Sequence, residues 1–318
     1  MNSPIKIQEL KKTINYEVDY FICSASYEER CLVIPTQLSE CNIKNVAIFC
    51  NKDFIELYNG NENKIASLFP IANSKIYNLN TKAPAPNALE ILSLFDTIED
   101  VQKMKFFIDT TTFTHETLLV LYKVITLKSI PIENVTYAYI NASDYSINET
   151  DLDKKWLSKG IGEIRNVIGY GGFMNPLKKN HLIVLVGIEL ERTQSLIDKI
   201  EPNSLSLGVS YDHCSKSLAA IELNKVKHKA LCDKYLDSES FEFTVLSPRP
   251  VKDTLVEVAS KHSDCNIIVA AMNNKISTIG AGIFANENHD VQISYATALQ
   301  YNIEGYTIPG DDCYLFQS

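Results

Sequence analysis

The densest cluster of polar residues in the chain is the segment Asp109–Glu116, which reads Asp-Thr-Thr-Thr-Phe-Thr-His-Glu. It lies between an apolar stretch, Lys105–Asp109, and an amphipathic stretch, His115–Leu127, which we predict to be a strand and a helix. Hydroxyl groups and the N–H groups at a helix start can bind a phosphate or a ribose. The candidate ligand-binding residues here are Thr110, Thr111, Thr112 and Thr114. The alternative is that Thr112 or Thr114 caps the helix.

The same segment contains residue types that can transfer protons. Asp109 and His115 form a potential acid/base pair beside threonine hydroxyls, which is a chemistry that hydrolases use. Glu28 and Glu29, which follow an earlier apolar stretch, are further candidates for a general acid or base. These four residues are the candidate catalytic set. We predict no metal site and no cofactor.

A second group of polar residues follows the first predicted strand, Asp19–Ser24. Its ligand-binding candidates are Ser24, Ser26 and Arg30, with Glu28 and Glu29 beside them. An arginine guanidinium can hold a phosphate or a carboxylate through two parallel hydrogen bonds, with a glutamate orienting it. The alternative is a local Glu–Arg ion pair at a helix start, where carboxylates favour the positive end of the helix.

Matching residues occur in the second half of the chain. Glu191 and Arg192 follow its first strand, and Arg192 lies 162 positions after Arg30. Lys82 and Arg249 follow the third strands, where a cation suits an anionic ligand or is simply a solvated surface charge. The remaining candidates follow the fourth strand of the second half, at Asn273, Asn274, Lys275 and Ser277.

Predicted strands alternate with predicted helices along the whole chain, which indicates mostly parallel sheets covered by helices. The predicted strands of the first half are Asp19–Ser24, Asn45–Asn51, Lys75–Asn80, Lys105–Asp109 and Val135–Ile140. Those of the second half are His181–Gly187, Ser204–Val209, Phe241–Leu246, Asn266–Ala271 and Val291–Tyr295. The predicted helices include Cys31–Glu40, Asn87–Phe95, His115–Leu127, Arg192–Ile200 and Val251–Lys261.

The two halves can be superimposed in sequence. The first and fourth strands match at an offset of 162, and the fifth strands, which begin at Val135 and Val291, match at an offset of 156. We therefore predict an α/β fold of two tandem Rossmann-like units, with mostly parallel sheets, related by internal duplication. The alternative is that any two α/β halves share such strand spacing by coincidence.

The predicted boundaries place the first unit at residues 1–146 and the second at 181–318. Between them, 147–180 is predicted to be a linker with a short helix, Asp151–Lys159, and a glycine-rich loop, Gly169–Asn180. Glycines allow a backbone to approach a ligand or partner closely, which is the alternative to a plain connection.

Composition limits the functional classes. The 318 residues are 45% hydrophobic and 22% charged, as in globular proteins, and the net charge is -9. This acidity disfavours non-specific binding to duplex nucleic acid or to an anionic membrane. The eight cysteines form no Cys-x-x-Cys pair, and no signal-peptide or membrane-spanning pattern is found. We therefore expect reduced thiols and a cytoplasmic protein.

The sequence Asp-Thr-Thr-Thr-x-Thr between a strand and a helix, within tandem α/β units, resembles ligand-sensing domains of prokaryotic defence systems. These are the CRISPR-associated Rossmann-fold (CARF) domains and the SAVED domains. The resemblance implies that a cyclic oligonucleotide binds between two pseudo-symmetric units. The implied contacts are the turns Thr110–Thr114 and Asn273–Ser277 and the loops Ser24–Arg30 and Gly187–Arg192. No effector domain is recognisable, so it also implies a separate effector protein.

Three functions are consistent with these patterns. The first is a module that binds or senses a nucleotide, such as a cyclic oligonucleotide, in bacterial anti-phage defence. The second is a nucleotide- or nucleoside-processing hydrolase that uses Asp109, Glu28 or Glu29. The third is a structural adaptor subunit of a defence complex, because tyrosine, of which the chain has 16, is enriched at protein interfaces. Whether the protein is an enzyme is left open.

Overall fold

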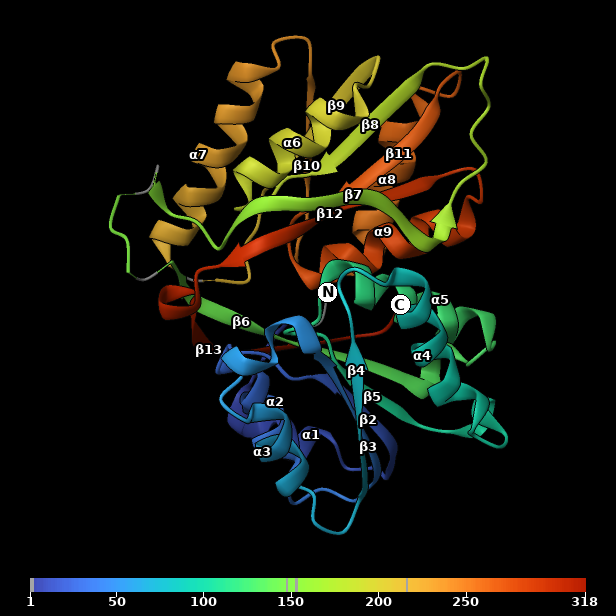
Figure 1. Cartoon of the computed structure of the whole chain (residues 1–318), viewed down its shortest axis with the longest axis vertical. Coiled ribbons are helices and arrows are strands. Elements are labelled where there is room, and N and C mark those ends of the chain that lie inside the picture. The colour runs from blue at the N-terminus through green and yellow to red at the C-terminus, as the bar shows by residue number, and fades with distance from the viewer. Residues whose placement is uncertain (1–2, 147, 152–153, 216) are drawn as a thin grey trace. The chain divides into compact units, whose positions relative to one another are not determined.

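The computed structural model describes residues 3–146, 148–151, 154–215 and 217–318. The chain forms two compact units. Unit 1 comprises Met1–Ser143 together with Thr307–Gln317, and unit 2 comprises Asp144–Tyr306 together with Ser318. Each unit therefore contains one α/β sheet with helices on its faces (Figure 1).

Unit 1 contains a seven-stranded sheet with the order β1-β13-β6-β5-β2-β3-β4. Strands β2 to β6 run parallel to one another. Their bounds are β2 Val18–Ser24, β3 Ile43–Asn51, β4 Asn73–Leu79, β5 Phe106–Asp109 and β6 Val135–Tyr145. At one side of β6 lie β13 (Thr307–Phe316) and the short edge strand β1 (Ile5–Lys6).

The helices of unit 1 form two groups, which lie on opposite faces of its sheet (Figure 1). One group is α1 Leu10–Thr13, α2 Arg30–Leu38 and α3 Asn61–Ser67, and the other is α4 Pro84–Asp96 and α5 His115–Leu127. The central strands are apolar on both faces because both faces are covered. Phe21, Val46 and Phe107 are accordingly among the fully buried core residues.

Unit 2 contains a six-stranded sheet with the order β10-β9-β8-β11-β12-β7. The bounds are β7 Ser158–Gly171, β8 Asn180–Leu185, β9 Ser204–Ser210, β10 Glu239–Phe243, β11 Asn266–Ala271 and β12 Gln292–Tyr301. All are parallel except β7, which pairs antiparallel with β12. The helices are α6 Leu190–Ile200, α7 Leu218–Lys234, α8 Pro248–Ser260 and α9 Lys275–Glu287.

The two sheets have the same topology, which confirms the predicted pair of Rossmann-like units. Counted along each half of the chain, the parallel strands lie in the order third, second, first, fourth, fifth in both sheets. A sixth strand then follows on the far side of the fifth. It is β7 in unit 2, and in unit 1 it is β13, where contacts join Tyr137 to Phe316 and Asn141 to Asp312. These contacts run in opposite directions along β6 and β13, so this pair is also antiparallel.

The predicted division of the chain differs from the observed one. We predicted a linker at 147–180, but its residues Ser158–Gly171 form the strand β7 of unit 2, so the predicted loop was wrong at Gly169–Gly171. The predicted helix Asp151–Lys159 lies partly outside the described residues and ends within β7. The segment 307–317, which we assigned to the second unit, belongs to unit 1. Glycines within β7 suggested a loop, but they mark irregular strand pairing, because β7 shifts register twice against β12.

Candidate functional site

The candidate site of each unit lies at the carboxyl ends of its first and fourth strands. In unit 1 these strands are β2 and β5, and in unit 2 they are β8 and β11. The strand order reverses at the first strand: the second and third strands lie on one side of it, and the fourth and fifth strands lie on the other. Ligands of open parallel sheets bind at such a switch point, outside the carboxyl ends of the strands.

Arg30 begins helix α2 and is only 5% exposed. Its Nε donates to Glu28 Oε2 at 2.8 Å, its Nη2 lies 2.6 Å from the same oxygen, and its Nη1 donates to the carbonyl of Ile140 on β6 at 3.2 Å. Glu28 Oε2 also accepts a hydrogen bond from Thr307 Oγ1 at 3.0 Å. The ion pair that we considered as an alternative therefore exists, and Arg30 contacts unit 1 itself.

Arg192, in the first turn of α6, occupies the matching place in unit 2 and is also 5% exposed. Its Nε and Nη2 donate to the carbonyl of Ala296 on β12, and its Nη1 donates to Ser158 Oγ at 3.2 Å. Its guanidinium lies over the Tyr295 ring, 5.6 Å from the centroid. Glu189 is 3.8 Å from Nη1 of Arg192, and its Oε2 accepts from both Oγ and N–H of Ser158.

The two arginine clusters match by sequence position in their arginines and in their carbonyl acceptors, whereas their glutamates are 161 positions apart. The unit 1 cluster is Glu28, Arg30, Ile140 and Thr307, and the unit 2 cluster is Glu189, Arg192, Ala296 and Ser158. The arginines are 162 positions apart, and the carbonyl acceptors Ile140 and Ala296 are 156 positions apart, which are the offsets of the first and fifth strands. Thr307 and Ser158 are the first residues of β13 and β7. The contact of the arginine with the fifth-strand carbonyl therefore recurs in both units, through Nη1 of Arg30 and through Nε and Nη2 of Arg192.

In unit 1, the turn after β5 is held by side-chain hydrogen bonds to the neighbouring strands. Thr110 Oγ1 donates to the carbonyl of Ala138, and Thr111 Oγ1 accepts from the N–H of Ile140. Thr112 Oγ1 donates to the carbonyl of Ser24 at 2.6 Å, which ties this turn to the end of β2. Thr110 and Thr111 are buried, whereas Thr112 and Ser24 are half-buried and accessible at the switch point.

Helix α5 is capped by Thr114, whose Oγ1 accepts the N–H of Thr117. The capping alternative for this residue is therefore observed. Asn274 does the same for α9, because its Oδ1 accepts the N–H of Ser277. Asn274 Nδ2 also donates to the carbonyl of Val245, which follows β10. Both caps position a helix start at the switch point of their unit.

In unit 2, Asn273 makes the contact that corresponds to that of Thr112 in unit 1, because it also donates to the carbonyl at the end of the first strand. Its Nδ2 donates to the carbonyl of Val186, which lies 162 positions after Ser24. A Cβ at Gly187 would lie 2.0 Å from the carbonyl oxygen of Met272, so only glycine allows this close approach of the two turns. Asn273 and Lys275 are half-buried.

Asp109 is the most unusual titratable group of the candidate site. It is 2% exposed, and its Oδ1 accepts the N–H of Thr111 at 2.9 Å. Burial raises the pKa of Asp109 to about 7, against the hydrogen bonds from Thr111 and the positive charge of Arg30, which favour the carboxylate. Such a pKa suits a general acid or base, but the burial keeps the carboxyl group away from a ligand at the surface.

The other predicted residues differ in their environment. Ser26 is buried and its Oγ accepts the N–H of Glu28, and His115 is half-buried. The exposed ones are Glu29, Lys82, Glu191 and Arg249. Lys82 follows β4, and Arg249 follows β10 and donates to the carbonyl of Ser318. The third-strand cations are thus exposed, and Arg249 also has a hydrogen-bond partner within unit 2.

Five members of the clusters were not predicted as site residues: the carbonyls of Ile140 and Ala296 and the side chains of Thr307, Ser158 and Glu189. Thr307 and Ser158 come from sequence-distant strands, and no local pattern marks them. Glu189 was visible as an acid near Arg192, but its partner Ser158 was not. Sequence spacing alone indicated the arginines, because they recur at a fixed offset.

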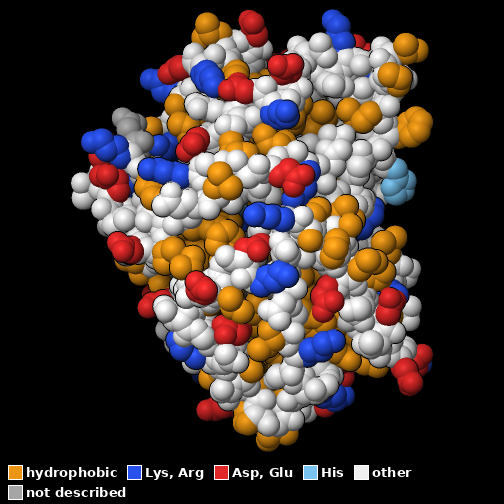
Figure 2. All heavy atoms as spheres, in the orientation of Figure 1, with side chains coloured by type: hydrophobic (Ala, Val, Ile, Leu, Met, Phe, Trp, Pro, Cys, Tyr) orange, Lys and Arg blue, Asp and Glu red, His pale blue; other side chains and the backbone are white. Residues whose placement is uncertain are grey.

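Among the residues that the structure describes, no group of three or more His, Cys, Asp or Glu side chains is placed to hold a metal ion. The described part of the chain also contains no helix that is both long and apolar enough to cross a membrane. All eight cysteines are free thiols. On the face seen in Figure 2, the described Lys and Arg side chains are interspersed with Asp and Glu.

No known family model matches the chain. No curated protein matches it in sequence. A structural comparison finds the crystal structure of UDP-GlcNAc 2-epimerase from Neisseria meningitidis bound to UDP-GlcNAc, with 12% sequence identity and a TM-score of 0.25. The match covers 80% of this chain and 77% of that chain. At this TM-score, it supports no inference about what this chain binds.

Proposed function

We propose that the protein binds a nucleotide at the carboxyl ends of its parallel strands and acts as a sensing module in a bacterial defence pathway. One repeated observation supports the binding. In each unit, a half-buried polar residue after the fourth strand is hydrogen-bonded to the carbonyl at the end of the first strand, as Thr112 is to Ser24 and Asn273 is to Val186. Both contacts lie at the switch point, where open parallel sheets bind nucleotides.

The chemistry of these turns suits a phosphorylated ligand. Unit 1 offers the hydroxyls of Ser24 and Thr112, and unit 2 offers the amide of Asn273 and the ammonium of Lys275. Each turn leads into a capped helix of 13 residues, α5 or α9, whose positive end favours an anion. Because Arg30 and Arg192 bond to their own units, we assign ligand contact to these turns.

The defence setting and the separate effector protein rest on the resemblance to CARF and SAVED domains. They are tested by expressing the tagged protein in its native host and identifying what co-purifies with it, with and without phage infection. An effector that is retained only in one of the two states supports a sensing role. Retention of the same partner in both states, with no nucleotide binding, supports a structural adaptor instead.

Nucleotide binding is tested by a thermal-shift panel of cyclic di-, tri- and tetranucleotides and of mononucleotides. A ligand at about 100 times its Kd stabilises the native protein by about 2.7 kcal/mol, which such a scan detects. The variants Thr112→Val and Lys275→Met are each expected to lower the apparent affinity for the nucleotide at least tenfold. Their thermal shifts at a given nucleotide concentration should therefore be smaller than that of the wild type.

The matched controls are Thr36→Val and Lys199→Met, since both residues are exposed and lie on helices away from the turns. They should leave the shift unchanged. No shift with any nucleotide, or equal affinity in Thr112→Val, Lys275→Met and the wild type, would remove the proposal.

A second candidate function is hydrolysis of the bound nucleotide, and the pKa of Asp109 near 7 is the observation that favours it. The carboxyl group is buried, so this reaction requires the turn Thr110–Thr114 to open around the substrate. Incubating the nucleotide panel with wild type and with Asp109→Asn tests it. Product formation that Asp109→Asn abolishes without loss of affinity supports hydrolysis, and turnover that is equal in both proteins, or absent, excludes a role for Asp109.

A further inference from the structure

If the chain is divided into two halves of six consecutive strands, β2–β7 and β8–β13, the last strand of each half lies in the sheet of the other half. β7 follows β6 in sequence, yet it pairs with β12 in unit 2. β13 follows β12 in sequence, yet it lies beside β6 in unit 1. A simple tandem repeat would instead pair β6 with β7 and β12 with β13. The duplicated units are therefore related by a reciprocal exchange of their sixth strands.

Each arginine cluster contacts the first residue of the exchanged strand. In unit 1, Thr307 donates to Glu28, which is paired with Arg30. In unit 2, Ser158 donates to Glu189 and accepts from Arg192. Each cluster also reaches the backbone of the fifth strand, at Ile140 or Ala296. The cluster thus joins the first helix, the fifth strand and the incoming sixth strand of its unit.

A second matched contact follows further along the exchanged strands. Asn141 Oδ1 accepts the N–H of Asp312, and a Cβ at Gly310 would lie 2.0 Å from that oxygen. In unit 2, Thr297 is 156 positions after Asn141, its Oγ1 accepts the N–H of Glu163, and a Cβ at Gly162 would lie 2.6 Å from it. The fifth strand therefore fixes the register of the sixth strand in the same way in both units.

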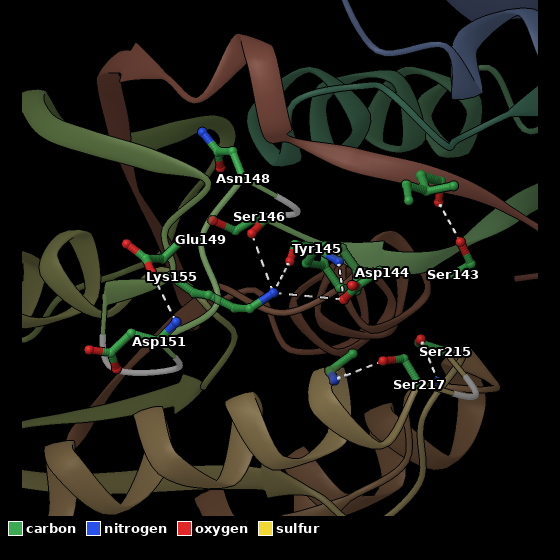
Figure 3. A network of polar contacts seen from close by, with 12 residues as sticks. Ser143, Asp144, Tyr145, Ser146, Asn148, Glu149, Asp151, Lys155, Ser215 and Ser217 are labelled. Atoms are coloured by element: carbon green, nitrogen blue, oxygen red, sulfur yellow. Dashed lines mark hydrogen bonds and ion pairs between the residues drawn. The ribbon is translucent and has the colours of Figure 1, made fainter.

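The two connecting segments are bonded to each other within unit 2. Asn302, directly after β12, donates to Ser146 Oγ and to Asn148 Oδ1, and the N–H of Ser146 donates to the carbonyl of Tyr306. Lys155 contacts the same segment (Figure 3). Its Nζ donates to the carbonyl of Tyr145 at 2.7 Å and to the carbonyl of Ser146 at 3.3 Å. The segment that leads from β6 to β7 and the segment that leads from β12 to β13 are thus held together by hydrogen bonds.

We propose that Arg30 and Arg192 are positioning residues that hold the exchanged strands, so that each half of the chain completes the sheet of the other half. The physical reason is that each sixth strand begins with a hydroxyl that donates to a glutamate of the receiving half. In unit 1 the arginine is hydrogen-bonded to that glutamate, and in unit 2 it donates to the strand's own Ser158 Oγ. Removing the arginine therefore loosens a strand whose sequence lies in the other half.

Hydrogen–deuterium exchange on the full chain tests this assignment. Arg30→Lys should raise the exchange rate of the β13 amides about tenfold, because the geometry of a charged hydrogen-bond network is lost. The amides of β7 and of β4, at the opposite edge of the unit 1 sheet, should keep their rates. Arg192→Lys should raise exchange in β7 and leave β13 unchanged. The control is Lys103→Met, which removes an exposed ion pair with Asp100.

Double-mutant cycles with the milder variants Thr307→Val and Ser158→Ala keep the test informative if an arginine variant folds poorly. Thr307→Val should be non-additive with Glu28→Gln and additive with Glu189→Gln in urea unfolding. Ser158→Ala should show the reverse. Coupling of Thr307 to Glu189 and of Ser158 to Glu28 would overturn the exchange, and additivity in all four pairs would overturn the role of the clusters. An equal rise in the exchange rates of the β7 and β13 amides in Arg30→Lys would also overturn the role of the clusters.

Discussion

The two arginine clusters share their position and differ in their electrostatics. In unit 1 the guanidinium pairs directly with Glu28, at 2.6 Å, whereas in unit 2 the distance to Glu189 is 3.8 Å. There the carbonyl of Ala296 and the face of Tyr295 hold Arg192, and Ser158 holds the carboxylate. The bond from the arginine to the fifth strand is common to both. Duplication has therefore kept the backbone anchor, while the ion pair has changed.

The turns after the fourth strands differ in a related way. Unit 1 ends that strand with the buried carboxyl group of Asp109, and unit 2 has Ala271 at the matching position, 162 residues later. Unit 1 then offers threonine hydroxyls, and unit 2 offers amides and Lys275. At these turns, unit 1 therefore has a buried carboxyl group and unit 2 has a half-buried lysine, so the two turns are not chemically equivalent.

The largest effect is expected from removing the arginines. Arg30→Met leaves Glu28 buried without its charge partner, which costs about 3–5 kcal/mol of unfolding free energy. Arg192→Met should cost less, about 2–3 kcal/mol, because Glu189 keeps both donors of Ser158. Urea unfolding measures both, with fluorescence of the single tryptophan, Trp156, reporting on unit 2. If Arg192→Met lost more unfolding free energy than Arg30→Met, the proposed electrostatic difference between the clusters would be contradicted.

Asp109 should give unit 1 a pH dependence that has no counterpart at the matching position of unit 2, which is Ala271. In the folded state the pKa of Asp109 is about 7 against an ordinary 3.8, so the unfolded chain releases its proton first as the pH rises. Stability should therefore fall from about pH 4 to about pH 7. Asp109→Asn keeps an acceptor for the N–H of Thr111 and removes the buried charge. Since each pKa unit is worth about 1.4 kcal/mol, the variant should gain at most about 4 kcal/mol at pH 8.

The matching measurement at pH 4 is the control for Asp109→Asn, because the wild-type carboxyl group is then largely protonated in the folded state. The gain should vanish there. The Trp156 signal should change little at either pH. A gain that is the same at both pH values would mean that packing, and not the carboxylate, explains the effect.

The close approach of the first and fourth turns can be broken in one unit only. Gly187→Ala places a methyl group 2.0 Å from the backbone of Met272, so backbone must shift, which typically costs about 1–3 kcal/mol. Ala25 occupies the matching place in unit 1, and Ala25→Gly should cost about 0.5–1 kcal/mol through chain entropy. Thermal unfolding followed by circular dichroism compares them. A harmless Gly187→Ala would show that these turns are not in close contact.

The smallest effects are expected from the helix caps. Thr114→Ala removes one cap bond and should cost about 1 kcal/mol. Asn274→Ala should cost more, about 2 kcal/mol, because it also removes the bond to the carbonyl of Val245. The comparison is made by urea unfolding at one pH. Equal losses would mean that the second bond of Asn274 contributes nothing to stability.

Most elements could be predicted because their signal is local. The strand Asn266–Ala271 and the helix His115–Leu127 have the predicted bounds, since an apolar run and a capped amphipathic stretch are each encoded within a few residues. Helix α7, Leu218–Lys234, was not predicted. It buries the polar side chains of Asn224 and Lys227, and this weakens the apolar stripe that marks a helix.

The candidate site was predictable only in part. Matching offsets pointed to Arg30 and Arg192, and capping by Thr114 was an alternative that follows from residue type. Asn274 was predicted only as a ligand contact, and its capping role came from the structure. Both arginines are hydrogen-bonded within their own units, in clusters that include Thr307 and Ser158. These two residues are far from the arginines in sequence. No local pattern reports such a pairing, so the ligand-binding roles of the two arginines stay a prediction that their burial does not favour.

The sequence by itself determined the α/β class, the duplication and the residues at the strand ends, because strand and helix periodicity and repeated offsets are written along the chain. Only the tertiary structure decided which half supplies the sixth strand of each sheet. Antiparallel pairing of β12 with β7 and of β6 with β13 joins residues more than a hundred positions apart. Local propensity is the same for either partner, and the choice is made by long-range packing and by the buried carboxylates that receive each strand.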